Sequence, residues 1–495
     1  MSRWMPKKLI LVSNRGPYTV KNVNGRRKVE RAVGGLVSAL EPAARSLPTV
    51  WVAWADSACN ETSCIPDEVP EFAWEQVTLT EEEVDKYYGG FANQALWPLC
   101  HYFIDKCLFD RCHWDAYTWV NKKFALQAFR HTTGNSLIWV HDYHLALVPH
   151  YLRSYGAANI GFFWHIPFPP PDVLGILPWG REVLRGLLGS DVIGFHVQQY
   201  VANFLRCAET FLNLSVDYDR GVVQYHGRSI RVVALPVGID ASTYAALGKK
   251  SDTVEAAAAI RQKVGTETLA LAVDRLDYSK GILERIDALA RFWARYESYR
   301  GRLSLIQIAA PTRSAVPAYQ NLRRQVEEAV GRINGLFGRE DWLPVYYYYR
   351  SFPQHELAAY YLAADTALVT PLRDGLNLVA KEYVATRQND GVLVLSRFAG
   401  VVEELREAVV VNPYDADGFG TKLKAALEMP APERRRRMQA LADKVKQRDF
   451  EWWLGNFITL LAGKETGEVL AKRIGKSKRA VAALSGELME EAARA

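Results

Sequence analysis

Twelve residues from Pro371 to Glu382 carry the clearest chemical pattern in the chain. They read Pro-Leu-Arg-Asp-Gly-Leu-Asn-Leu-Val-Ala-Lys-Glu and follow an apolar, strand-like run at residues 366–370. A strand that enters a helix through a glycine turn leaves backbone N–H groups at the helix start, where anions such as phosphates bind. Gly375 has no Cβ, so the backbone can approach a ligand closely at that point. The segment therefore predicts an anion site at the start of a helix.

Two carboxylates flank this predicted anion site. Asp374 stands on the turn, and Glu382 lies about two helical turns further along. Ionised carboxylates only accept hydrogen bonds, which makes them suitable for recognising hydroxyl groups. A nucleotide sugar, with its diphosphate, ribose and hexose, would use the anion site and both carboxylates. The alternative is a solvated turn before an ordinary amphipathic helix, and the segment alone does not decide between the two.

A second pattern, at residues 272–281, places two cations across a turn. Arg275 and Lys280 follow a strand-like run and are five residues apart. Arginine binds phosphate as a planar fork and lysine binds it as a point charge, so together they could hold a departing diphosphate. The alternative is a surface pair that bridges to Asp274 and Asp277.

Histidines end two apolar runs in the first half of the chain, at residues 139–144 and 162–168. His141, Asp142 and His144 are too crowded on one turn to converge on a metal ion, so we expect no metal site there. His165 is expected to face the same ligand as Asp142 and the motifs of the second half.

Four of the six cysteines are spaced as two matched pairs, Cys59 with Cys64 and Cys107 with Cys112. Four intervening residues are at the outer edge of zinc-binding spacings, so we interpret these cysteines as ordinary thiols. The sequence does not settle whether either pair forms a disulfide.

The elements that must position these residues are short β-branched runs that alternate with helical stretches. The strand-like runs are 9–13, 50–54, 137–140, 160–164, 192–195, 231–235, 269–273, 303–308, 343–348, 366–369, 392–395 and 409–411. Such alternation predicts parallel sheets with right-handed crossovers, in which ligands bind beyond the carboxyl ends of the strands. The polar residues described above follow these runs directly. The fold class is therefore α/β, with two Rossmann-like parallel-sheet domains that we expect to face a central cleft.

A chain of 495 residues is too long for one hydrophobic core and suggests two domains of roughly 200–250 residues each. We place the first domain at 1–238 and the second at 239–463, with a polar helical tail at 464–495. The last helices of the second domain could pack back on the first. Residues 21–31 are charged, and we expect them to form a loop that covers the ligand.

Composition excludes several classes of protein. With 49% hydrophobic and 23% charged residues, the chain is typical of a globular protein in water, and no apolar run approaches the roughly 20 residues of a membrane span. Residues 7–15 read as a first strand and not as a secretory signal, so a cytoplasmic location is expected. The net charge of +6 has a local contribution from Arg434 to Arg437, which we interpret as a solvated helix face and not as a nucleic-acid site.

Six motifs together resemble those of the trehalose-6-phosphate synthase family, in one order and with similar spacing from about residue 9 to about residue 460. They are Asn14-Arg15 with Gly34-Gly35-Leu36, residues 88–98, residues 141–145, residues 165–169, residues 275–281 and residues 374–383. The resemblance implies a retaining glycosyltransferase of the GT-B architecture. It would move glucose from a nucleotide diphosphate glucose, typically UDP-glucose, to glucose 6-phosphate, and release α,α-trehalose 6-phosphate and UDP.

The resemblance also implies roles for individual residues. The donor-binding residues would be Gly34, Gly35, His165, Arg275, Lys280, Asp374, Gly375, Leu376, Asn377, Leu378 and Glu382. The acceptor-binding residues would be Arg15, Trp54, Tyr88, Trp97, Asp142 and Arg313. The catalytic residues would be Arg275, Lys280, His165, Asp142 and Asp374. The family's front-face route has the leaving phosphate accept the proton of the attacking hydroxyl, so neither a metal ion nor another cofactor is expected.

Two alternatives to this function remain open. A sister transferase would keep the fold and use another phosphorylated acceptor, such as glycerol 3-phosphate, and a non-catalytic homologue would act as a sugar-phosphate sensor. The retained Arg275, Lys280 and Glu382 argue against the sensor. The nucleotide base, whether of UDP-, ADP- or GDP-glucose, is not determined. We also expect a homo-oligomer and a separate phosphatase that acts on the product.

Overall fold

The computed structural model describes residues 8–23, 26–31, 40–41, 44, 48–54, 72–313 and 316–463, without the side chains of residues 19–31. Several predicted features lie outside these residues: Gly34, Gly35, Cys59, Cys64 and the tail at 464–495. The chain divides into two compact units. Unit 1 comprises Met1–Val237 and Phe450–Ala495, and unit 2 comprises Gly238–Asp449.

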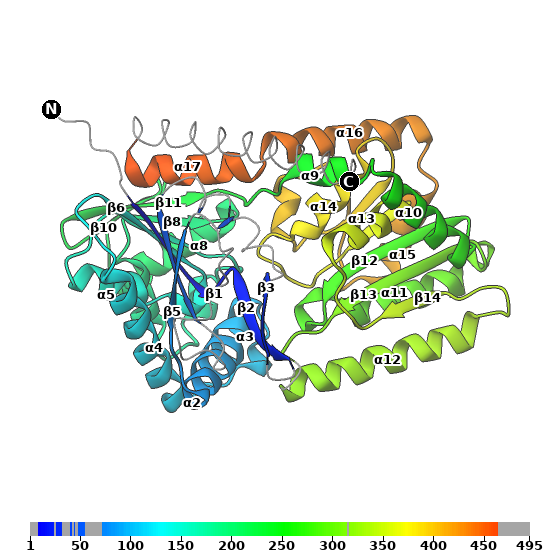
Figure 1. Cartoon of the computed structure of the whole chain (residues 1–495). Helices are drawn as coiled ribbons and strands as arrows, with labels where there is room; N and C mark the ends of the chain where they lie inside the picture. The colour runs from blue at the N-terminus through cyan, green and yellow to red at the C-terminus, as the bar shows by residue number, and fades with distance from the viewer. Residues whose placement is uncertain are drawn as a thin grey trace. The chain divides into compact units, whose positions relative to one another are not determined.

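Unit 1 contains a nine-stranded sheet in the order β5-β4-β1-β6-β7-β8-β11-β10-β9 (Figure 1). The strands are β1 Lys8–Arg15, β4 Thr49–Trp54, β5 Ala73–Val77, β6 Ser136–His141, β7 Ile160–Phe163, β8 Val192–Phe195, β9 Val216–Asp217, β10 Val222–Tyr225 and β11 Arg228–Ala234. Those from β5 to β11 pair in parallel, and β9 and β10 add an antiparallel edge. The central strand β1 is buried from Leu9 to Asn14, as expected for a parallel strand with both faces covered.

Helices connect these strands and cover the sheet. In unit 1 they are α2 Glu81–Val84, η2 Asp85–Leu96, α3 Trp97–Cys100, η3 Ile104–Lys106, α4 Arg111–Phe129, η4 Tyr143–Leu145, α5 Val148–Ser154, α6 Pro171–Leu174, α7 Gly180–Leu187, α8 Gln198–Leu212 and α17 Phe450–Ala462. The helix η2 is a π-helix, a rare form that occurs frequently at functional sites.

The helix α17 belongs to unit 1 although unit 2 precedes it in the chain. Its Phe457 ring stacks on Trp139 of β6, with 4.5 Å between ring centroids and 10° between planes. Glycines in the neighbouring strands make room for this ring. A Cβ at Gly161 would come within 2.7 Å of Phe457, and one at Gly194 within 2.9 Å.

The charged segment at residues 21–31 is not the loop that we expected. Its described backbone forms an antiparallel hairpin, β2 Tyr18–Val23 with β3 Arg26–Arg31, in which Val23 pairs with Arg26. The two intervening residues, Asn24 and Gly25, are a strong sequence signal for a hairpin, and the count of charged residues obscured that signal.

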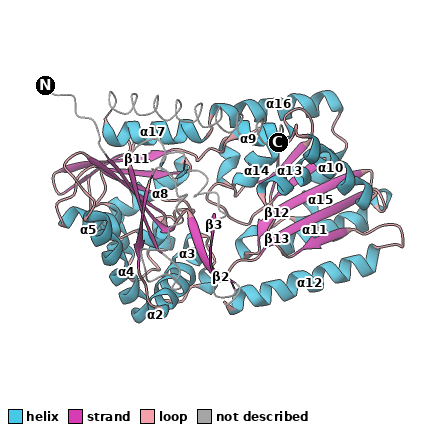
Figure 2. Cartoon of the chain, in the orientation of Figure 1, coloured by secondary structure: helices cyan, strands magenta, loops and turns pink. Residues whose placement is uncertain are grey.

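Unit 2 contains a six-stranded parallel sheet in the order β14-β13-β12-β15-β16-β17. The strands are β12 Thr268–Arg275, β13 Leu303–Ala310, β14 Val345–Tyr348, β15 Thr366–Val369, β16 Val392–Ser396 and β17 Val409–Val411. The helices are α9 Ala241–Leu247, α10 Ser251–Val264, η5 Tyr278–Lys280, α11 Ile282–Arg295, η6 Glu297–Tyr299, α12 Pro317–Phe337, α13 Gln354–Ala363, α14 Leu378–Arg387, η7 Gly400–Glu403, α15 Ala416–Leu427 and α16 Ala431–Gln447. Strands and helices alternate along the chain, which Figure 2 shows by colour.

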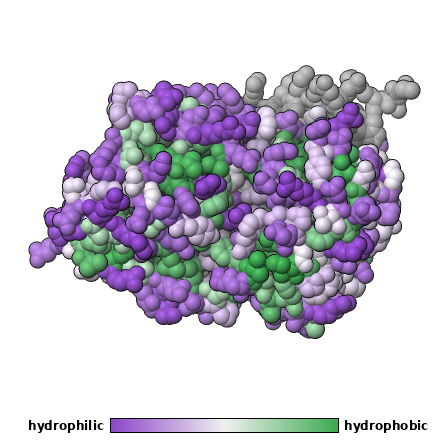
Figure 3. Space-filling model, turned by 180° about the vertical axis from the view of Figure 1, so that it is seen from behind, coloured by the Kyte–Doolittle hydropathy of each residue, from purple (hydrophilic) through white to green (hydrophobic). Residues whose placement is uncertain are grey.

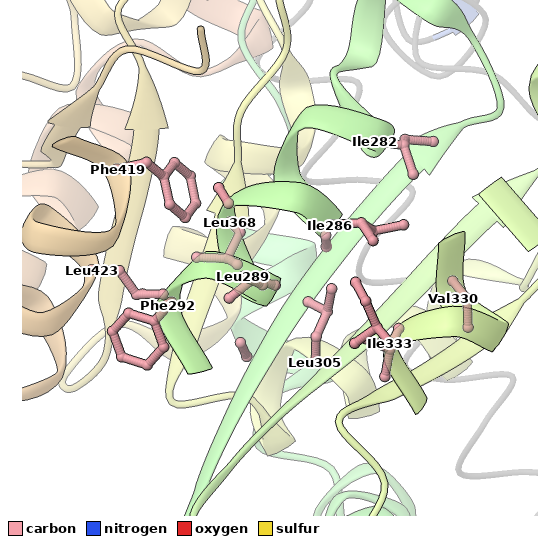
Figure 4. Packing of buried hydrophobic residues seen from close by; sticks show 14 of the residues in the cluster. Ile282, Ile286, Leu289, Phe292, Leu305, Val330, Ile333, Leu368, Phe419 and Leu423 are labelled. Carbon is pink, nitrogen blue, oxygen red and sulfur yellow. The ribbon is translucent and has the colours of Figure 1, made fainter. Parts of the chain in front are cut away.

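Helices lie on both faces of the unit 2 sheet, with α11, α12 and α15 on one face and α10, α13, α14 and α16 on the other (Figure 1). The first face contains a buried cluster in which Leu289 and Phe292 of α11 lie between the sheet residue Leu305 and the α15 residues Phe419 and Leu423 (Figure 4). The α/β fold class with two parallel sheets is therefore confirmed.

Surface and helix composition agree with the sequence-based exclusion of a membrane span. On the face that Figure 3 shows, hydrophobic residues occur in separate groups among hydrophilic ones. Across the described parts of the chain, every helix is too short or too polar to traverse a bilayer.

Replacing Phe457 by alanine should lower the free energy of unfolding of unit 1 by about 3–5 kcal/mol, because the fully buried ring would leave a cavity beside two glycines. Thermal or denaturant unfolding measures this loss. The control is Asn456→Ala, which changes an exposed side chain on the same helix. Equal unfolding midpoints for the two variants would contradict this account of how α17 is held.

Candidate active site

The two patterns predicted for the second half of the chain, at residues 371–382 and 272–281, come together at the carboxyl ends of the unit 2 strands. Lys280 Nζ lies 2.5 Å from Asp374 Oδ2, and their side chains are only 10% and 14% exposed. Asn377 Nδ2 donates to the same oxygen at 3.0 Å. Lys280, Asp374 and Asn377 therefore form one polar cluster, although 94 residues separate the ion pair in sequence.

Backbone hydrogen bonds hold the two loops of this cluster against each other. The N–H groups of Leu372 and Arg373 donate to Ser279 O at 2.8 and 3.3 Å. Gly281 has φ +65°, and a Cβ at this position would come within 2.5 Å of Thr370 O. Only glycine combines that backbone conformation with so close an approach, and so Gly281 sets the separation of the two loops.

A buried arginine that the sequence analysis did not single out ties the strand ends together. Arg285 of α11 donates to Asp274 Oδ2 on β12 and to Gln307 Oε1 on β13, both at 2.7 Å. It also donates to Thr370 Oγ1, directly after β15, at 2.9 Å and to Lys280 O at 3.2 Å. Its side chain is fully buried. One guanidinium group therefore joins three adjacent strands to the loop that carries Lys280.

The helix α14 begins at Leu378, as the turn at residues 374–377 predicted. Asn377 has φ +86° and caps the helix, because its side-chain oxygen accepts from Ala380 N at 3.4 Å. The first N–H groups of any α-helix lack an acceptor within the helix, which makes this start suitable for an anion. Main-chain bonds from Gly400 N to Asp374 O and from Val401 N to Leu376 O fix the preceding turn.

Glu382 lies on the second turn of α14 and is half-buried. The Tyr361 hydroxyl donates to Glu382 Oε2 at 2.7 Å, and the Tyr244 side chain lies close to the same carboxylate. Burial raises the pKa of Glu382, whereas the two tyrosine hydroxyls oppose that rise. Neither tyrosine was predicted to have a role in the site.

Arg313, the one predicted acceptor residue in unit 2, lies next to the donor pattern. Its Nη1 donates to Asp277 Oδ2 at 3.2 Å, and Tyr319 donates to the same oxygen at 3.0 Å. Burial opposes the ionisation of Asp277, yet the charges of Arg313 and Arg275 lower its pKa to about 2. Asp277 is therefore an anion at neutral pH that two arginines stabilise, while Arg275 itself is exposed.

The other acceptor residues lie in unit 1, where Arg15, Trp54 and Tyr88 form a cluster. Arg15 and Trp54 end the paired strands β1 and β4, and the register shifts between Ser13 and Arg15. The Arg15 guanidinium lies 4.4 Å from the Trp54 ring centroid and 5.5 Å from that of Tyr88, which η2 contributes. Aromatic faces on a guanidinium fix its plane, which prepares it for a bidentate anion such as phosphate.

Asp142 and His165 also lie together in unit 1. Asp142 has φ +73°, and its Oδ1 accepts from Tyr143 N at 2.9 Å and from His165 N at 3.2 Å. His165 Nε2 lies 3.1 Å from His141 Nδ1. Burial, together with neighbouring histidines, lowers the pKa of both rings, so they are neutral at pH 7 and one donates to the other.

Trp97 is buried and lies against His101, with 4.1 Å between ring centroids, and against Tyr143 at 5.8 Å. The described residues contain no cluster of three or more His, Cys, Asp or Glu that could hold a metal ion. Cys107 and Cys112 are free thiols.

Each unit thus has polar and charged residues at the carboxyl ends of a parallel sheet, which is where α/β proteins of the doubly wound class bind their ligands. The comparison with known proteins gives the family. The chain belongs to glycosyltransferase family 20, whose model matches residues 7–463.

Two curated relatives illustrate the similarity. The trehalose-6-phosphate synthase of Mycobacterium avium is 40% identical over 466 residues, which cover 92% of this chain and 95% of that protein. A bifunctional trehalose-6-phosphate synthase/phosphatase of Thermoproteus tenax is 39% identical over 94% of this chain, and the match spans 65% of its own length.

Two solved structures are similar over nearly the whole chain. An E. coli structure described as trehalose-6-phosphate bound with UDP-2-fluoro glucose has a TM-score of 0.85 at 34% identity and covers 92% of this chain and 99% of its own. An α,α-trehalose-phosphate synthase (UDP-forming) from Burkholderia xenovorans, in complex with glucose-6-phosphate, has a TM-score of 0.83 at 36% identity and covers 92% and 100%. The resemblance inferred from the six motifs is confirmed.

Replacing Arg285 by methionine should lower the free energy of unfolding of unit 2 by about 3–5 kcal/mol, because Asp274 would remain buried without its counter-ion. Denaturant unfolding measures the loss. The control is Arg291→Met on the same helix, where the lost ion pair with Asp287 is more than half exposed and adds little to stability. Similar stability of both variants would show that the buried network does not hold the strand ends.

Proposed function

We propose that the chain is a retaining glycosyltransferase that moves glucose from UDP-glucose to glucose 6-phosphate and forms α,α-trehalose 6-phosphate and UDP. The observation that carries this proposal is the match to glycosyltransferase family 20 over residues 7–463, with relatives named trehalose-6-phosphate synthases. One similar structure is bound with UDP-2-fluoro glucose and another is in complex with glucose-6-phosphate. These ligands correspond to the two substrates.

The donor would bind at the strand ends of unit 2. Negative charge accumulates on the diphosphate as its bond to glucose breaks, and groups fixed in advance stabilise that charge best. Arg275, Lys280 and the start of α14 would supply this stabilisation without a metal ion or other cofactor. Asp374 and the backbone from Gly375 to Leu378 would contact the glucose, and Gly34 and Gly35 would contact the phosphates.

The acceptor would bind at the strand ends of unit 1. The Arg15 guanidinium, which lies over the Trp54 and Tyr88 rings, would bind the 6-phosphate as a planar fork. Trp97 and Asp142 would shape the sugar site. The attacking hydroxyl would give its proton to the leaving phosphate, so the reaction needs no protein base, and the neutral His165 would contact a sugar hydroxyl and not act as a cation.

An assay of UDP release tests the proposal directly. Purified protein should release UDP from UDP-glucose only when glucose 6-phosphate is present, and the sugar product should be α,α-trehalose 6-phosphate. Release with glycerol 3-phosphate in place of glucose 6-phosphate would indicate a sister transferase. No release with either acceptor, despite binding of UDP-glucose, would indicate a sensor.

Replacing Arg275 by alanine should lower kcat by about 10²–10³-fold, because the leaving diphosphate would lose one charged donor. The protein should stay folded with only a small fall in its thermal midpoint, because Arg275 is exposed and Arg313 still pairs with Asp277. Steady-state kinetics with both substrates varied measures the effect.

Two further variants provide the comparison for Arg275→Ala. Arg324→Ala removes an exposed arginine of α12 and should leave kcat unchanged. Arg15→Ala should mainly raise the KM for glucose 6-phosphate and not that for UDP-glucose. If Arg275→Ala kept the wild-type kcat, the assigned role of this residue would be wrong.

A further inference from the structure

Glu382 is held by side chains from two other helices. Tyr361 of α13 donates to Glu382 Oε2 at 2.7 Å, and Tyr244 of α9 lies close to the same carboxylate. The two tyrosines are only 1% and 9% exposed, whereas Glu382 is half-buried. The carboxylate is therefore fixed from its buried side and remains reachable from the other.

The position of Tyr244 is itself fixed. The Gln354 side chain lies close to the Tyr244 hydroxyl. The helix α9 also lies directly against α14, since a Cβ at Gly248 would come within 2.7 Å of Thr386 O. Three helices of unit 2 thus converge on one carboxylate.

We propose that Tyr361 and Tyr244 position Glu382 so that its remaining lone pairs accept hydrogen bonds from the ribose hydroxyls of the donor, and that these tyrosines set the preference for a ribonucleotide over a 2′-deoxyribonucleotide. The inference rests on the proposed function and on the donor-binding role that the family resemblance implies for Glu382, which is to hold the ribose hydroxyls. A carboxylate offers about four lone-pair sites, of which the Tyr361 bond uses one. The remaining sites are enough for the two adjacent hydroxyl groups of a ribose.

The tyrosines matter because the last torsion of a glutamate side chain has no sharp preference. The Tyr361 donor, with Tyr244 beside it, restricts the rotation of the carboxylate and keeps it aimed at the ligand. They also favour its ionised form, in which both oxygens only accept. A site built in this way rejects a ligand that lacks a hydroxyl group, because a buried acceptor is then left unpaired.

If these tyrosines only stabilised the fold, their loss would not change the preference for a ribonucleotide over a 2′-deoxyribonucleotide. Tyr383 offers a matched control, because it lies on α14 next to Glu382 and its buried hydroxyl donates to Asp365 O at 3.1 Å. Tyr383→Phe and Tyr361→Phe each remove one buried tyrosine hydrogen bond. Of these two variants, only Tyr361→Phe removes a hydrogen bond to the Glu382 carboxylate.

The experiment measures the dissociation constants of UDP and 2′-deoxy-UDP by calorimetry, for the wild type and for the variants Tyr361→Phe, Tyr244→Phe and Tyr383→Phe. We expect the wild type to bind UDP more tightly than 2′-deoxy-UDP. Tyr361→Phe should reduce that ratio by about tenfold, the effect of one hydrogen bond to a charged group, and Tyr244→Phe should reduce it by a smaller factor. Tyr383→Phe should keep the ratio, and thermal melting should show that all variants are folded.

The inference is overturned if the wild type does not discriminate between the two nucleotides, or if both tested tyrosine variants keep the wild-type ratio. It is equally overturned if Tyr383→Phe lowers the ratio as much as Tyr361→Phe does. These binding measurements need no turnover. A failure of the proposed transfer reaction would instead appear as absent UDP release by the wild type, so the two failures can be told apart.

Discussion

The buried guanidinium of Arg285 is the interaction on which the geometry of unit 2 depends. Parallel strands end in polar residues at one edge of a sheet, and such residues need a partner when no water reaches them. Arg285 satisfies Asp274 and Gln307 on adjacent strands and also binds Lys280 O. The same bonds that satisfy the buried carboxylate therefore fix the backbone that carries Lys280. Stability of the sheet and the placement of a site residue have one physical cause.

An ion pair extends this arrangement to α14. Lys381 and Glu404 pair at 2.7 Å with side chains 0% and 4% exposed, and burial lowers the pKa of Lys381 against the opposing effect of Glu404. Adjacent residues on a helix project about 100° apart, so Lys381 and Glu382 hold α14 from different directions. The helix start can then present its N–H groups in a fixed direction, as electrostatic stabilisation of a leaving group requires.

The sequence predicted the strands better than it predicted the residues that contact the site residues. Each of the twelve strand-like runs corresponds to a strand, because a strand buried on both faces has a continuous apolar run. The strand β5, with exposed Ala73 and half-buried Glu75, lacks such a run and was missed. Arg285, Tyr361 and Tyr244 were missed for another reason. They lie outside the motifs, and only the packing of separate helices brings them to the site.

The Lys280–Asp374 pair shows that Lys280 has a second role in this site besides that of a cation for phosphate. A carboxylate beside a phosphate-binding helix start would repel the phosphate if its charge were not compensated. Lys280 at 2.5 Å and Asn377 at 3.0 Å provide that compensation, and both side chains of the ion pair are largely buried. Loss of Lys280 would therefore do more than remove one cation, because it would leave Asp374 as an uncompensated anion at the same place. The lysine allows a carboxylate that accepts from hydroxyl groups to lie next to a group that binds phosphate, and a nucleotide sugar contains both.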